Sequence, residues 1–313
     1  MPPPVANVLK SRADADEWRN LINDRPRGLD RRRRITNKVA LGAITAAFCL
    51  AIAPLVSVLW TVVSAGLNRI DVEFFTQSMR GVIGEGGGAL HAIMGTIQIT
   101  LAAAVISVPV GILAAVYLVE YGRGAFARTL TLLVDVMTGI PSIVAGLFAF
   151  ALFSLAFGPG VRAGVAGAVA LSLLMTPVVI RSAEEMLRLV PTELREASQA
   201  LGAPKYRTIT DVVLPTAASG ITAGVMLGIS RIVGETAPLL LVAGFTDSMN
   251  YNLFSGRMAS LPVFIYSQWQ NKGVDAAAYD DRAWSAALTL IAFVFVLNLA
   301  SRMANRFLGA KAR

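Results

Sequence analysis

Long apolar runs alternate with short polar segments along most of this chain. Each run has few or no charged residues, and most reach the roughly 20 residues that a helix needs to cross a bilayer. We therefore predict an all-α membrane protein with six transmembrane helices. The six runs are residues 39–68, 86–119, 129–161, 163–180, 215–246 and 283–301.

Composition supports the same class. The chain is 55% hydrophobic and 15% charged, whereas soluble domains carry about 25% charged residues. Within the third run, Gly139 and Pro141 predict a kink. The backbone groups that a kink leaves free must face protein or a water-filled path.

Lys and Arg residues predict the orientation in the membrane. If the N-terminus is inside, 21 of the 28 Lys and Arg residues lie on the inner side, as the positive-inside rule requires. Both termini are then cytoplasmic, and so is the polar segment between the fourth and fifth runs. We interpret residues 1–37 as a cytoplasmic tail and residues 38–313 as one transmembrane domain. The basic stretch 31–34 precedes the first run and favours anionic lipid over nucleic acid as its partner.

Several kinds of chemistry have no support in the sequence. No GxxxxGK[ST] loop is present, and we interpret the glycine-rich segment 84–88 as a linker because it lacks the strand and helix context of a phosphate-binding loop. Cys49 is the single cysteine, so an internal disulfide is impossible. We expect no enzyme activity, no ATPase site, no metal and no cofactor in this chain.

The segment EASQALGAPKYRTITDVVLP, residues 196–215, carries the most specific motif. Its spacing of Glu-Ala-small, Gly and Leu-Pro resembles the EAA motif of ABC-importer permeases, with Ser198 where that family most often has Ala. The resemblance implies a type I ABC-importer permease fold and a coupling loop at about residues 184–215, the coupling segment, which docks on an ATPase. We expect Gly202 to form a turn between two short helices because Gly tolerates positive φ. The implied coupling residues are Glu196, Ala197, Ser198, Gly202, Ala203, Leu214 and Pro215.

Two charged residues interrupt the fifth run. Four-residue spacing would place Arg231 and Glu235 on one helix face, and charges at membrane depth usually face the bundle interior or a cavity. They could form an ion pair that only locks the bundle, or they could line a solute path, with Arg181 as a second cation. Guanidinium groups suit oxyanions. A neighbouring carboxylate suits an anion that carries a proton, which favours phosphate over sulfate.

Residues 230–240, SRIVGETAPLL, sharpen this interpretation. They resemble the signature of PstA-type phosphate-import permeases, and residues 138–146, 177–184 and 261–266 are similar to other segments of that family. The resemblance implies a plasma-membrane importer of inorganic phosphate. Its other parts would be a PstC-like permease, two cytoplasmic ATPase subunits that hold ATP and Mg²⁺, and an extracytoplasmic phosphate-binding protein.

Two alternatives remain open from the sequence. One is an importer for another oxyanion, such as molybdate or phosphonate. The other is a secondary transporter that uses Glu235 as a proton site. Inverted repeats would favour the secondary transporter, and we find none in the sequence.

Overall fold

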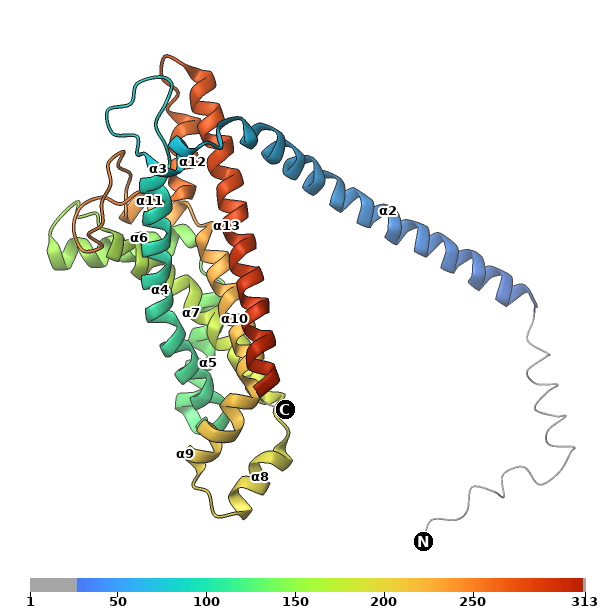
Figure 1. Ribbon diagram of the computed structural model, residues 1–313. Coiled ribbons are helices and arrows are strands. Elements are labelled where there is room, and N and C mark those ends of the chain that lie inside the picture. The colour runs from blue at the N-terminus through green and yellow to red at the C-terminus, as the bar shows by residue number, and fades with distance from the viewer. Residues whose placement is uncertain (1–26, 312–313) are drawn as a thin grey trace, which may run out of the picture. The chain divides into compact units, whose positions relative to one another are not determined.

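The computed structural model describes residues 27–311, and this part of the chain contains helices and loops without a strand. The chain divides into two compact units, Met1–Trp60 and Thr61–Arg313. The described part of the first unit is a single element, most of helix α2 (Arg27–Gly66), which is shown in blue in Figure 1. Its apolar side chains are largely exposed, including Leu50 and Trp60.

The second unit is built around α4 (Leu90–Val116) and α7 (Gly164–Arg188), which pack closely along their length. The Ser107 hydroxyl on α4 donates to the Ser172 carbonyl on α7 at 3.2 Å. At Gly111, an added Cβ would lie only 2.6 Å from Cγ1 of Val179. Small residues thus allow these two helices to approach each other, as is common in membranes.

Two further helices complete the bundle. Helix α10 (Leu214–Val233) packs on α7, and at Gly224 an added Cβ would lie 2.3 Å from Cβ of Ser182. Helix α13 (Ala276–Lys311) packs beside α10 (Figure 1), where Asn298 Nδ2 donates to the Ser230 hydroxyl at 3.2 Å.

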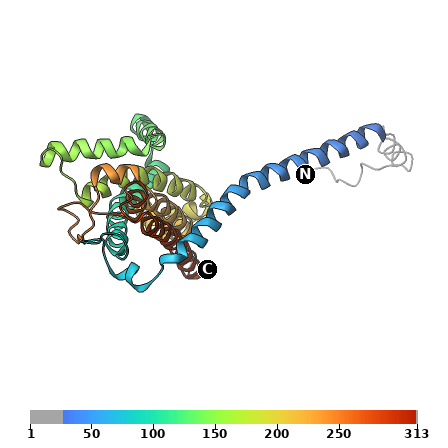
Figure 2. The ribbon, with the colours of Figure 1, turned by 90° about the horizontal axis from the view of Figure 1, so that it is seen from above.

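The third apolar run forms two helices, α5 (Gly124–Thr138) and α6 (Ser142–Phe157). They meet at a bend of 109°, so the predicted kink is confirmed and is sharper than an ordinary proline kink. Helix α6 runs across the direction of α13, which Figure 2 shows nearly end-on. Five helices of the described chain are long and apolar enough to cross a membrane, or six if α5 and α6 make one crossing. The predicted count of six holds in the second case.

The structure of the fifth apolar run differs from the prediction of one continuous helix. Helix α10 ends at Val233, and a new short helix, α11 (Ala237–Val242), begins after a break. Pro238 cannot continue the preceding helix because it lacks an N–H and its ring clashes with the carbonyl four residues earlier. The expectation that Arg231 and Glu235 lie one turn apart on one helix face is therefore wrong.

The two ends of the second unit carry different loops (Figure 1). One end holds the coupling segment with α8 (Thr192–Ala200) and α9 (Lys205–Arg207). The other end holds 3-10 helix η2 (Leu67–Arg69), α3 (Val72–Thr76) and α12 (Leu261–Gln270). The cytoplasmic placement of the coupling segment and of both termini stays a prediction, as does the domain boundary at residue 37.

Candidate functional site

The coupling segment folds as two short helices joined by a tight turn, as its sequence predicts. Gly202 ends the first helix with φ of +83°, in the left-handed region that favours glycine. The amide of Gly202 donates to the Gln199 carbonyl at 2.9 Å, and the next amide, of Ala203, donates to the Ser198 carbonyl at 3.2 Å. An added Cβ at Gly202 would meet nothing within 4 Å. Glycine is therefore needed here for its backbone conformation and not for space.

After the turn, the backbone changes its type of helix twice before α10 is established. The helix α9 leads into a π-helix, η4 (Thr208–Val213), and Leu214 and Pro215 then begin α10. Proline fits the first turn of a helix because its missing N–H has no partner there in any case. The hydroxyl groups of Ser198 and Thr208 lie 2.9 Å apart and join α8 to η4. The small residue at 198 thus ties the two halves of the segment together.

Other motif residues lie open at the surface. Glu196 and Ala197 are exposed, and the Glu196 carboxylate makes no hydrogen bond or ion pair within the part of the chain that the structure describes. Apolar side chains are exposed beside them at Leu194, Leu201 and Tyr206, and Leu201 is 89% exposed. Apolar groups gathered on an exposed, polar segment indicate a surface that a partner covers.

Two basic side chains hold the coupling segment against the end of α4. The α4 helix ends in a π-helix, η3 (Tyr117–Tyr121). Arg195 Nε donates to Glu120 Oε1 at 3.0 Å, and Lys205 Nζ donates to the Glu120 carbonyl. Sequence reasoning missed Glu120 because it lies 75 residues before Arg195 and has no local motif.

The three predicted solute-path residues are not bonded to one another. Arg231 is exposed near the end of α10, and Glu235 is half-buried after that end. Among the described residues, no ion pair within 4.0 Å joins Arg231 to Glu235. The locking ion pair that the sequence allowed is therefore absent from this conformation.

Arg181 has partners of its own. Its guanidinium pairs with Asp135 on α5, and Nη1 donates to Glu184 Oε2 at 2.7 Å. Glu184 also accepts from Arg188 at 2.7 Å. No sequence motif marks Asp135, whereas the structure makes it the link between α5 and α7.

An open apolar cavity of about 590 Å³ lies directly after Glu235 in the chain. Its side chains come from the start of α11 and from α12, so it borders the break that ends α10. The lining residues are Thr236, Ala237, Leu240, Pro262, Ile265, Tyr266 and Trp269.

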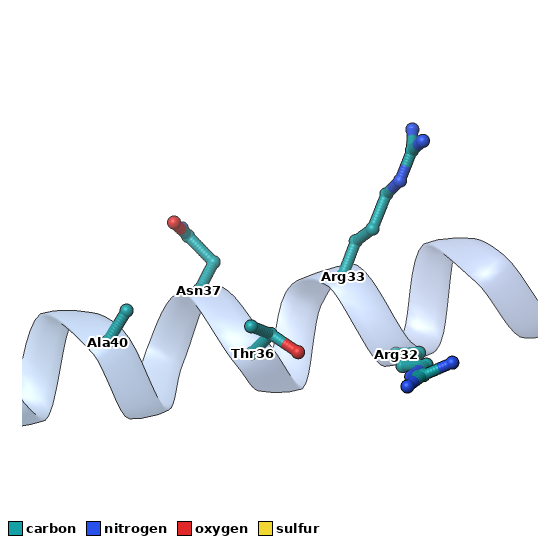
Figure 3. Close-up of a pocket in the computed structure, with 5 residues that line it drawn as sticks. All are labelled: Arg32, Arg33, Thr36, Asn37 and Ala40. Atoms are coloured by element: carbon teal, nitrogen blue, oxygen red, sulfur yellow. The ribbon is translucent and has the colours of Figure 1, made fainter.

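The basic start of α2 carries a shallow, open pocket. Figure 3 shows the guanidinium groups of Arg32 and Arg33 extending from different sides of the helix, with Thr36, Asn37 and Ala40 completing the lining. These side chains are exposed, as expected for groups that meet lipid headgroups. Within residues 27–311, no group of three or more His, Cys, Asp or Glu side chains is placed so that it could hold a metal ion.

Comparison with known proteins shows which family this chain resembles and which solved structures share its fold. A family model described as "Binding-protein-dependent transport system inner membrane component" matches residues 107–313. The phosphate transport system permease protein PstA 1 of Mycobacterium tuberculosis (strain CDC 1551 / Oshkosh) is 48% identical over 290 residues, which cover 92% of this chain and 94% of that protein. The PstA protein of Pasteurella multocida is 37% identical over 87% of this chain and 95% of that protein.

Solved structures share the fold at low sequence identity. A bacterial alginate ABC transporter chain superposes with a TM-score of 0.61 at 15% identity, covering 88% of this chain and 97% of that chain. A chain of the MetNI methionine ABC transporter in an inward-facing conformation gives a TM-score of 0.54 at 22% identity, covering 71% and 94%. The predicted type I ABC-importer permease fold is confirmed.

Proposed function

The chain belongs to the family of binding-protein-dependent transport system inner membrane components, and from this premise we propose that it is the membrane permease subunit of an ATP-driven importer of inorganic phosphate. The observation that carries the proposal is the similarity to PstA permeases, at 48% identity over 92% of this chain. The phosphate-type signature at residues 230–240 lies within that similarity. The chain is a multi-pass inner-membrane protein with apolar helices long enough to span a bilayer.

The proposed role of this chain is to form part of the solute path and not to hydrolyse ATP. ATP and Mg²⁺ bind to a separate cytoplasmic ATPase, and this chain carries no cofactor. Family membership implies an assembly with another permease, with ATPase subunits and with a binding protein. More specifically, we propose one PstC-like permease, two ATPase copies and an extracytoplasmic phosphate-binding protein.

The coupling segment is the proposed contact with the ATPase. Its exposed Glu196 carboxylate and the exposed Leu201 side chain offer charge and apolar surface together. The left-handed turn at Gly202 holds the helices on either side of it in a fixed relation. Closure of the ATPase on ATP then moves this segment as a unit, and the bundle changes between outward-open and inward-open conformations.

Arg231 and Glu235 are the proposed polar points on the solute path. Each has no ion-pair partner within the described chain, which leaves both free to contact a solute. An arginine fork matches two oxygens of a phosphate, and a carboxylate can accept the proton that monohydrogen phosphate carries. Arg181 is the proposed cation nearer the cytoplasm, and its pairing with Asp135 and Glu184 must loosen before it can bind an anion.

Transport by the complete complex tests the proposal. The chain is reconstituted into proteoliposomes with its partner permease, ATPase and binding protein, and uptake of labelled phosphate is measured with and without ATP. We expect uptake that depends on ATP and on the binding protein, and that molybdate and phosphonate do not inhibit. ATP-dependent uptake of another oxyanion in preference to phosphate contradicts the assigned solute. Uptake driven by a proton gradient without ATP contradicts the class of transporter.

A further inference from the structure

One glutamate joins the coupling segment to the rest of the bundle. Glu120 lies in the π-helical end of α4, and its side chain is only 9% exposed. Its carboxylate accepts from Arg195 at 3.0 Å, and the same residue's carbonyl accepts from Lys205. Arg195 precedes the Gly202 turn and Lys205 follows it, so both halves of the coupling segment are tied to one position.

The Arg195 guanidinium makes three hydrogen bonds at this junction. Besides Glu120, it donates from Nη2 to the Leu187 carbonyl at 2.8 Å and from Nη1 to the Val190 carbonyl at 2.5 Å. Its side chain is 17% exposed. A planar guanidinium held by three acceptors has little freedom to turn. The end of α7, the start of α8 and the end of α4 are thus fixed in one arrangement.

Lys205 strengthens the same junction. Its ammonium group lies 4.5 Å from the centroid of the Tyr121 ring, the residue next to Glu120. A cation over an aromatic face is attracted by the negative face of the ring. The second half of the coupling segment is therefore held by a hydrogen bond and by a cation–π contact.

The other end of α4 contacts the opposite side of the molecule. Thr96 Oγ1 accepts a buried hydrogen bond from the Leu261 amide at 2.8 Å. At Gly95, an added Cβ would lie 1.9 Å from the Ala259 carbonyl oxygen, so the backbone of residues 258–261 lies directly on the helix. Thr96 and Glu120 are 24 positions apart, which corresponds to roughly 36 Å of helix. One continuous helical segment, with Pro109 inside it, thus reaches from the coupling segment to the loops at the other end.

We infer that Glu120 is a positioning residue for energy coupling, which makes α4 follow the movement of the coupling segment and carries that movement to residues 258–261. This inference rests on the proposed function, because it assigns a route by which the ATPase acts on the distant loops. A π-helix is an inserted residue in an α-helix and is common at functional positions. The π-helices η3 and η4 lie on either side of this junction.

The test compares transport with ATP hydrolysis in the complete reconstituted complex. We measure phosphate imported per ATP hydrolysed for wild type, Glu120→Ala and Glu120→Gln. The alanine variant loses the acceptor for Arg195, and we expect the ratio to fall about tenfold, the usual effect of one hydrogen bond to a charged group. The Lys205 bond goes to the backbone of residue 120 and is kept. Glutamine keeps an acceptor oxygen and should recover much of the ratio.

A double variant separates positioning from folding. Glu120→Ala with Arg195→Met removes both charges, so neither partner is left as an uncompensated charge, and only the Leu187 and Val190 carbonyls lose a donor. If the pair only stabilises the fold, the double variant assembles and restores the wild-type ratio of phosphate to ATP, and the inference is overturned. We expect instead an assembled complex that hydrolyses ATP at a near-normal rate and stays uncoupled.

Two controls complete the design. Glu85→Ala removes an exposed carboxylate that has no side-chain bond among the described residues, and it should keep the wild-type ratio. A wild-type complex that moves no phosphate contradicts the proposed function itself. A transporting wild type with an unchanged ratio in Glu120→Ala contradicts only the inference.

Discussion

The guanidinium of Arg181 on α7 pairs with the carboxylate of Asp135 on α5, 46 residues earlier in the chain. The same guanidinium binds Glu184 at 2.7 Å, so two carboxylates balance one predicted solute-path cation. The Asp135 side chain is 58% exposed, and that of Glu184 is 9% exposed. The two carboxylates therefore have different roles. Asp135 forms a link that can open, and Glu184 is a fixed part of the helix packing.

Neutral variants of these two carboxylates should differ in stability. Asp135→Asn removes the more exposed of the two pairs, so its loss should be the smaller, about 0–1 kcal/mol. Glu184→Gln removes a buried negative charge and one of the two acceptor oxygens that Arg181 and Arg188 use, and the loss should reach about 1–3 kcal/mol. Thermal unfolding of the purified complex measures both variants. A larger loss for Asp135→Asn than for Glu184→Gln contradicts this assignment.

Substitutions at Gly202 should follow the conformational preference of each residue and not its size. The position has φ of +83° and open space around it. Asn adopts the left-handed region most readily after Gly, Ala does so at a cost of about 1 kcal/mol, and a β-branched residue is worst. We expect phosphate uptake to fall in the order Gly, Asn, Ala, Val, with uptake lost in Gly202→Val and with membrane levels near normal.

Gly81 provides a matched control for this series. It has φ of +75° and nothing within 4 Å of an added Cβ, but it lies outside the coupling segment. Gly81→Val imposes the same kind of backbone strain and should keep the ratio of phosphate to ATP. Equal uncoupling by both valine variants would assign the Gly202 effect to general destabilisation.

Arg282 should be required for the fold and not for transport chemistry. It is 1% exposed, and it donates to Gln268 Oε1 at 2.9 Å and to the Gly84 and Gly86 carbonyls at 2.7 and 3.1 Å. Arg282→Ala leaves these acceptors without a donor, and we expect a loss of about 2–4 kcal/mol. Reduced levels of folded protein in the membrane provide the measurement. Arg80→Gln is the control because its side chain is exposed and unbonded in the described chain, and it should have no effect.

The local features of this fold follow from the sequence. The apolar runs, the break at Gly139 and Pro141, and the turn at Gly202 each depend on a few adjacent residues. Their physical causes are the length of a bilayer-crossing helix and the allowed φ angles of Gly and Pro.

The long-range contacts do not follow from the sequence. Arg282 belongs to no sequence motif, yet it lies inside α13 and holds the glycine-rich segment 84–88. The Glu120–Arg195 and Asp135–Arg181 pairs join residues that only the packing of α4, α5 and α7 brings together. Periodicity also extended the fifth helix through Glu235, because hydrophobicity is continuous there while Pro238 ends the helical backbone.

That break changes what variants of Arg231 and Glu235 should do. An ion pair buried in a bundle is damaged by removal of one partner, which leaves an uncompensated charge and costs about 3–5 kcal/mol. No such pair exists within the described chain, so Arg231→Gln and Glu235→Gln should each give a normally assembled complex. If both residues line the solute path, each variant loses phosphate uptake, and the double variant is no better than either one. Arg231→Lys keeps the charge without the planar fork, so it should transport slowly.

Uptake into proteoliposomes is measured beside the subunit composition of each complex. Full uptake by the double variant would remove both residues from the path, and rescue of a defective single variant by the double one would show that they pair in another conformation of the transport cycle.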